Sequence, residues 1–278
     1  MVVQHNITSM NANRQLGIVG GNLAKASEKL SSGYRINRAA DDAAGLAISE
    51  KMRSQVRGLQ RASDNAQDGI SLIQTAEGAM DAQHQILQRA RELVVQRSNS
   101  AVLSDTDQAK INDELTQLNE EISRIADSIT YNGTALHQRE GKLQVGADDS
   151  STDAGAKKNA ITLDKNDLTF AKSLASTGTA DTTISDMKTL TIDQVDKQIE
   201  VVSSKRSKLG AIQNRLEYTV KVVDNTAENM ASAESRIRDT DMADEMTRFS
   251  KENILQQAAT SMLAQANQAN QGVLSLLQ

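Results

Sequence analysis

The chain has 278 residues and a net charge of −5, with 38% hydrophobic and only 2% aromatic side chains. It contains no cysteine, which excludes disulfides, thiolate metal sites and a cysteine nucleophile. Because its three histidines lie far apart in the sequence, we expect no metal site, and the acidic balance argues against a nucleic-acid partner. No apolar run approaches the roughly 20 residues of a membrane helix, so we expect no membrane insertion.

An apolar stripe at heptad spacing marks the N-terminal segment. Leu16, Val19, Leu23 and Leu30 lie on this stripe. The glycine-rich segment Gly17–Gly21 follows no predicted strand and precedes no phosphate-binding pattern. We therefore interpret these glycines as a place of close helix packing.

Two further helices are predicted before the middle of the chain. Apolar positions at helical spacing predict a long helix from about Asp42 to Asn99. The segment Ser104–Asp107 has the residues of a helix start, and a second apolar seam runs from Ile111 to Ile129. Long helices packed side by side would make a bundle.

The composition changes between Gly141 and Asp186, where Gly, Asp, Ser, Thr and Lys are dense. Two short runs in this region alternate apolar and polar residues, namely Lys142–Val145 and Ala160–Leu163. They predict the strands of a small hairpin-like patch joined by polar loops.

The last third of the chain carries the longest heptad seam. Apolar residues 3 and 4 positions apart run from Ile192 to Ile237, over about six heptads, which is typical of a coiled coil. Proline is absent, and a proline inside such a helix would cost about 3 kcal/mol. The predicted fold class is mainly α: a long coiled-coil helical bundle rod formed by both chain ends, with a small β-hairpin region in the middle.

A second terminal stripe closes the sequence, and it includes Leu255, Ala259, Met262, Ala266, Val273 and Leu276. The remaining faces are mostly Gln, Asn and Ser, whereas a membrane-surface helix would favour Lys and Arg. A two-helix hairpin cannot bury such wide apolar faces by itself. We predict that both ends are disordered in the monomer and become ordered by packing against copies of the chain.

Several ordered motifs resemble those of bacterial flagellin. They are Leu30–Asn37, Ala40–Ile48, Asn65–Leu72 and Leu87–Leu93 near the start, and Ser235–Ala243, Ile254–Ala258, Met262–Asn267 and Val273–Leu277 near the end. The span Gly141–Asp186 is too short for the large outer domains that many flagellins carry. The sequence therefore resembles a minimal flagellin with the core helical domains only.

The resemblance implies a structural subunit without catalytic residues or cofactors, which polymerises into the flagellar filament. It implies an inner domain of paired terminal helices, residues 1–43 and 235–278, and an outer helical domain, residues 44–234, with the β region at about 141–188. It further implies export without a cleaved signal peptide, an extracellular location, and a flagellar export chaperone, cap and hook-junction proteins as partners.

The resemblance also implies recognition of the monomer by host Toll-like receptor 5. The family's receptor patch uses an Arg and a Leu of one helix and a Glu of the next. The matching residues here are Arg89 and Leu93, with Glu114 as the third member and Gln88 beside them. The same residues could instead face another subunit in the filament.

Two alternatives stay open on the sequence alone. A hook–filament junction protein would share the terminal helices without polymerising at length. A coiled-coil scaffold would form a finite oligomer and would need no export.

Overall fold

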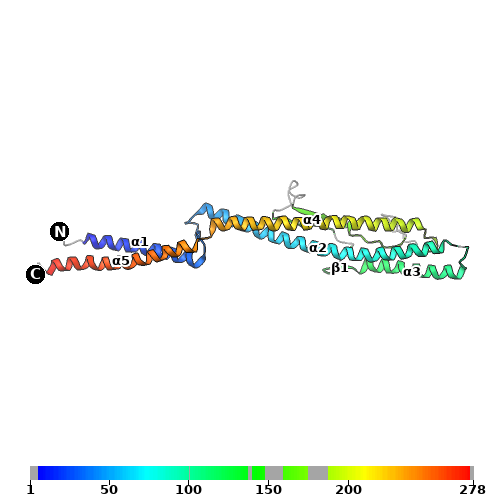
Figure 1. The fold of residues 1–278 in the computed structure, drawn as a ribbon, viewed down its shortest axis with the longest axis horizontal. Helices are drawn as coiled ribbons and strands as arrows, with labels where there is room; N and C mark the ends of the chain where they lie inside the picture. The colour runs from blue at the N-terminus through cyan, green and yellow to red at the C-terminus, as the bar shows by residue number, and fades with distance from the viewer. Residues whose placement is uncertain (1–5, 100, 137–139, 148–158, 175–186, 276–278) are drawn as a thin grey trace. The chain divides into compact units, whose positions relative to one another are not determined.

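The computed structural model describes residues 6–99, 101–136, 140–147, 159–174 and 187–275, with backbone only for 165, 187 and 269–275 (Figure 1). The chain divides into two compact units. The first, unit 1, combines residues 1–54 and 229–278, and the second, unit 2, contains residues 55–228. Both ends of the sequence therefore belong to the same unit.

Unit 1 is built on two antiparallel helices, α1 (Ile7–Ser32) and α5 (Met242–Ser275), which lie side by side in Figure 1. The Asn6 side chain donates a hydrogen bond to the carbonyl oxygen of Ala266 at 3.0 Å. At the other end of the pair, the Thr240 amide donates to the Gly33 carbonyl oxygen, also at 3.0 Å. These two contacts fix the register of α1 against α5. In an antiparallel pair the numbers of facing residues have a nearly constant sum, and the two contacts agree on that sum.

The bounds of α1 follow from its capping residues. Asn6 accepts a hydrogen bond from the Ser9 amide and so satisfies one of the free donors at the start of the helix. Gly33 ends the helix in the left-handed region, with φ 75°, and its amide donates to the Lys29 carbonyl oxygen.

Unit 2 is a bundle around α3 (Asp105–Ser128) and the long helices α2 (Ala43–Arg97) and α4 (Ile192–Arg238), of which α2 and α4 also contribute to unit 1. The seam predicted for α4 is buried at every seventh residue. Its buried members are Val195, Val202, Leu209, Leu216 and Val223. Burial at this repeat is what coiled-coil packing requires.

The predicted hairpin patch is present. Strand β3 (Gly141–Gln144) pairs antiparallel with β4 (Ala160–Leu163), and Leu143 lies opposite Ile161. The patch lies close to α2, since a Cβ added to Gly69 would come within 2.5 Å of Leu143 Cδ1. Glycine at this position therefore lets the strand approach the helix.

A second strand pair was not predicted. Strands β1 (Thr130–Tyr131) and β2 (Thr134–Ala135) are joined by Asn132 and Gly133, both at positive φ, 49° and 73°. Two such residues form the tight turn preferred in hairpins, and an Asn-Gly pair adopts it readily. The turn ends the helical region directly after α3.

A 3-10 turn, η2 (Lys165–Asp167), follows β4, and a second one, η3 (Met187–Thr189), precedes α4. Gln83, fully buried on α2, holds the segment around Ala171 against α2 and α3. Its side chain donates to the carbonyl oxygens of Ile122 and Ala171 and accepts from the Ala171 amide. The buried amide is thus fully used, as a polar group inside a core requires.

The mainly helical class with a small β region is confirmed. Within the described residues, no helix is both long and apolar enough to cross a membrane.

Candidate functional site: the terminal helix faces and the Arg89 surface

The predicted stripe of α1 lies in the interface with α5. Leu16, Val19, Leu23 and Leu30 are half-buried there. Apolar side chains on the other side of α1 are exposed, among them Ile7, Met10 and Ile18 at 63%, 66% and 51%. The helix thus has more apolar surface than α5 covers.

The predicted stripe of α5 is split between two faces. Ala259 and Ala266 are half-buried, whereas Leu255 and Met262 are 40% and 65% exposed. The side chain of Val273 and the whole of Leu276 lie outside the described residues. The exposed apolar side chains of α5 are therefore available to a partner.

The face that α5 buries in unit 1 contains residues that sequence reasoning missed. Glu245 and Glu252 are 8% and 9% exposed, and Phe249 and Gln256 between and after them are half-buried. These four positions are 3 or 4 residues apart, so they share one face. That spacing was visible in the sequence, but the charges concealed the pattern.

The interpretation of the α1 glycines as a place of close helix packing is wrong for the chain by itself. A Cβ added to Gly17, Gly20 or Gly21 would meet no other atom within 4 Å. These positions border open space because α5 packs on another side of α1.

Unit 1 consequently has little buried apolar surface. Among its described residues, the hydrophobic side chains that are buried are those of Ala26 and Ile36. Unit 2 buries many large ones, including Ile73, Leu115 and Leu209. Since burial of apolar area is the main favourable term in folding, unit 1 is the less stable of the two on this account.

The residues matched to the receptor patch lie on α2 and α3. Arg89 Nε and Nη2 both donate to Glu114 Oε1, at 3.0 and 2.9 Å, and Arg89 Nη1 donates to Glu92 at 3.2 Å. The side chains of Arg89 and Glu114 are about half exposed, and that of Glu92 is 69% exposed. The hydrogen bonds that Arg89 donates to Glu114 raise the pKa of Arg89 above its ordinary value, so the guanidinium is charged at every physiological pH.

The two remaining residues of the patch differ in exposure. Gln88 is exposed, and its amide nitrogen lies 2.9 Å from Nε2 of His84. Leu93 is only 2% exposed and belongs to the core of unit 2. The structure thus brings Gln88, Arg89 and Glu114 to one surface and places Leu93 beneath it.

Within the described residues, no cluster of His, Asp and Glu is arranged to hold a metal ion. The surfaces considered as candidate binding sites are the apolar faces of α1 and α5 and the charged surface around Arg89.

Comparison with known proteins identifies the family. Residues 3–140 match the model of the bacterial flagellin N-terminal helical region, and residues 192–277 match that of the C-terminal helical region. A flagellin of Halalkalibacterium halodurans is 52% identical, and one of Bacillus subtilis is 46% identical. A flagellar filament core protein of Treponema maltophilum is 43% identical, and all three alignments cover the whole of both chains. The chain therefore belongs to the bacterial flagellin family, in a minimal form without a large variable domain.

Proposed function

We propose that this chain is the subunit of a flagellar filament and polymerises with copies of itself. The observation that carries the proposal is the exposed apolar surface of unit 1. Ile7 and Met10 on α1, and Ile254 and Met262 on α5, are each more than 60% exposed. Burial of such side chains by a neighbouring subunit is favourable, because it removes apolar surface from water. The name of the Treponema maltophilum relative, a flagellar filament core protein, supports the same role.

The terminal helices form the inner part of the filament in this proposal, with residues 1–43 and 235–278 as the inner domain and 44–234 as the outer domain. Within each subunit the α1 stripe from Leu16 to Leu30 packs against α5, and copies of the inner domain pack on its partly exposed edges. The C-terminal stripe from Leu255 to Leu276 contributes its exposed side chains, such as Leu255 and Met262, to the same packing among subunits. Because unit 1 has a sparse core, packing among subunits adds to the stability of these ends.

The subunit is exported without a cleaved signal peptide and acts outside the cell. Its partners before and during assembly are an export chaperone and the cap and hook-junction proteins. The family resemblance supports these statements.

Electron microscopy of purified, seeded protein tests the proposal. Long tubes are expected for the wild type, and Met262→Glu should prevent them because it places a charge in a buried subunit contact. Gln257→Glu adds the same charge on an exposed position of α5 and serves as the control. Short or no assemblies from the wild type would favour a hook–filament junction protein, and discrete bundles would favour a scaffold.

A second function, recognition of the monomer by Toll-like receptor 5, is supported by the Arg89 surface. A half-exposed guanidinium held by Glu114 presents a preorganised charge to a partner. Gln88 extends this surface, and the buried Leu93 supports the helix beneath it.

Binding of the monomer to the receptor ectodomain tests this second function. Arg89→Ala and Glu114→Ala should each weaken binding about tenfold or more if the pair lies in the contact. Arg124→Ala, which removes an exposed guanidinium paired with Glu121 elsewhere on α3, should leave the affinity unchanged. Unchanged affinity in all three variants would reject the function.

A further inference from the structure

A row of exposed side chains runs along the outward side of α4 in unit 2. Its positions are 3 or 4 residues apart, from Val201 to Val222, so they share one face of the helix. Apart from Ser204, the members of this α4 row are Val201, Lys208, Ala211, Arg215, Tyr218 and Val222. Tyr218 and Val222 are 70% and 64% exposed, and the row contains no acidic residue.

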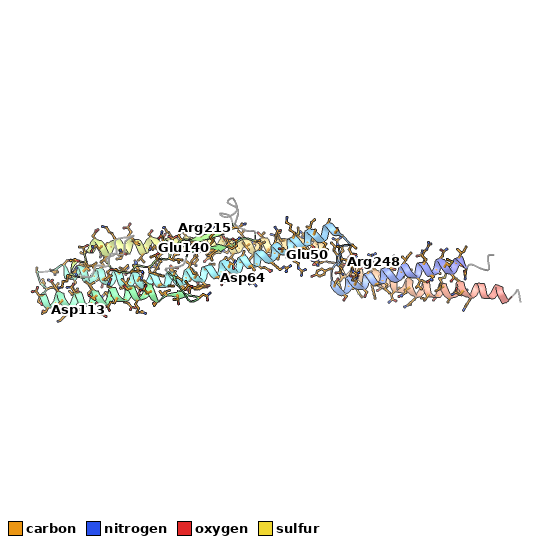
Figure 2. The ribbon with its side chains drawn as sticks, turned by 180° about the vertical axis from the view of Figure 1, so that it is seen from behind. Glu50, Asp64, Asp113, Glu140, Arg215 and Arg248 are labelled. Atoms are coloured by element: carbon orange, nitrogen blue, oxygen red, sulfur yellow. The ribbon has the colours of Figure 1, made fainter. Side chains whose placement is uncertain are left out.

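The positive charge on this side of α4 is largely without a partner. Arg215, labelled in Figure 2, takes part in no ion pair within the described part of the chain, and the same holds for Lys221. The Lys221 Nζ lies 5.6 Å from the centroid of the Tyr218 ring. Lys208 is 63% exposed and makes one pair, with Asp167 at 3.3 Å. The α4 row thus combines exposed apolar surface with available positive charge.

Helix α3 of the same unit carries the complementary charge. Asp113, Glu120 and Asp127 are exposed and seven residues apart, so they lie on one face, here called the α3 face (Asp113 is labelled in Figure 2). None of the three takes part in an ion pair among the residues that the structure describes. Both basic residues of α3 are already paired with other carboxylates of the same helix. The α3 face therefore has negative charge to offer to an outside partner.

Charge favours one occupant of the α4 row, namely the α3 face of a second copy. Two α4 rows against each other would bring basic side chains together, and like charges across an interface are costly. The acids of the α3 face have the same seven-residue spacing as Lys208 and Arg215. Two opposite-charge pairs can therefore form at once when α4 of one copy lies along α3 of another.

A contact of this kind also has the symmetry that a polymer requires. It joins two different faces of the subunit, so each pair of copies still has one α4 row and one α3 face free. Such heterologous contacts repeat from copy to copy and produce open helical filaments when the rotation between subunits does not close.

We propose that the α4 row binds the α3 face of a second copy of this chain. Tyr218 and Val222 become covered in this contact, and the basic side chains beside them pair with the acids of the α3 face. This inference rests on the proposed polymerisation and assigns to it a contact between outer domains, in addition to the packing of the terminal helices.

Two charge-reversed variants of the full chain test the pairing through the critical concentration for filament growth. The first is Arg215→Glu with Lys221→Glu, and the second is Asp113→Lys with Glu120→Lys and Asp127→Lys. Each variant alone should raise the critical concentration about tenfold or more, because it places like charges opposite each other.

An equal mixture of the two variants should assemble near the wild-type critical concentration. In the mixture, the reversed row of the first variant fits the reversed face of the second, and their unchanged surfaces fit each other. Copies that alternate along the contact therefore regain opposite charges at every junction.

Two single variants complete the experiment. Tyr218→Ser changes no charge and should still raise the critical concentration about fivefold or more, because it removes an aromatic side chain from the contact. Arg61→Glu reverses a charge on α2 whose side chain is 84% exposed, and it should leave the critical concentration unchanged.

A wild-type critical concentration for either charge-reversed variant alone, or for Tyr218→Ser, overturns the inference. So does a mixture that assembles no better than its components, because the α4 row then faces a surface other than the α3 face. Failure of the wild type to form any filament would instead reject the proposed function itself.

Discussion

The guanidinium of Arg238, at the end of α4, lies over the ring of Tyr34, with Cζ 4.7 Å from the ring centroid. Its Nη1 donates a hydrogen bond to Glu50 Oε1 of α2 at 2.5 Å, and the side chain is 12% exposed. The Arg35 amide donates to the Arg238 carbonyl oxygen, and Tyr34 and Asp239 form an isolated bridge. One residue therefore connects α4, α2 and the turn after α1 within unit 1.

Replacement of this arginine should loosen the turn. Arg238→Met keeps an unbranched side chain but removes the contact with Tyr34 and the ion pair with Glu50. The amides of Arg35 and Thr240, which donate across the turn, should then exchange about tenfold faster, equivalent to about 1.4 kcal/mol. Hydrogen exchange followed by mass spectrometry measures this change. Arg61→Met is the control, because its side chain is 84% exposed and should leave these amides unaffected.

The buried amide of Gln83 should be essential for the packing of the segment around Ala171. Gln83→Leu fills a similar volume but leaves the N–H and C=O of Ala171 without their partner. The free energy of unfolding of unit 2 should fall by about 1–3 kcal/mol in urea titrations. Gln85→Leu, at an exposed position of the same helix, should change it by less than about 0.5 kcal/mol. Equal effects of the two substitutions would contradict the role given to Gln83.

Two glycines of α2 should respond in opposite ways to alanine. A Cβ at Gly78 meets nothing within 4 Å, so Gly78→Ala should raise the free energy of unfolding by about 0.4–1 kcal/mol. A Cβ at Gly69 would lie 2.5 Å from Leu143 Cδ1, so Gly69→Ala should destabilise the β3–β4 patch by about 1 kcal/mol or more. Thermal unfolding of the two variants measures the difference. Stabilisation by both would show that the patch does not approach α2 as described.

The start of α3 should be sensitive to pH. The Ser104 hydroxyl donates to Asp107 at 2.7 Å, and this hydrogen bond is the main cause that lowers the pKa of Asp107 below its ordinary value. A carboxyl group whose pKa is lower in the folded than in the unfolded state stabilises the folded state at pH values above its unfolded-state pKa. That contribution is lost as the pH falls through its folded-state pKa. Ser104→Ala should raise the pKa of Asp107 in an NMR titration. Ser98→Ala, which removes a hydroxyl that donates to the Val94 carbonyl oxygen instead, should leave it unchanged.

Much of the fold could be predicted because it depends on repeats and capping residues. The seam of α4 predicted which residues are buried, since Val195, Leu209 and Leu216 recur at heptad spacing. Ser104 likewise marked the start of α3, where its side chain accepts from the Asp107 amide. The predicted structural rather than enzymatic role is confirmed by the family.

Other features depend on contacts that no local pattern expresses. The face of α5 that becomes buried contains Glu245 and Glu252, and charge alone would place such residues in solvent. Gln83 is buried because a distant segment needs its amide, which spacing on α2 cannot reveal. The Asn132–Gly133 turn was a recognisable hairpin signal, but it followed a helical seam and was overlooked.

The hydrogen bond from Asn6 to Ala266 has a kinetic consequence. The two residues are 260 positions apart, so α1 is synthesised long before the helix α5 on which it packs. Contacts of such long sequence separation form late, because the loop between them must close first. A newly made chain therefore passes through a period in which unit 2 can fold while α1 has no helix to pack against.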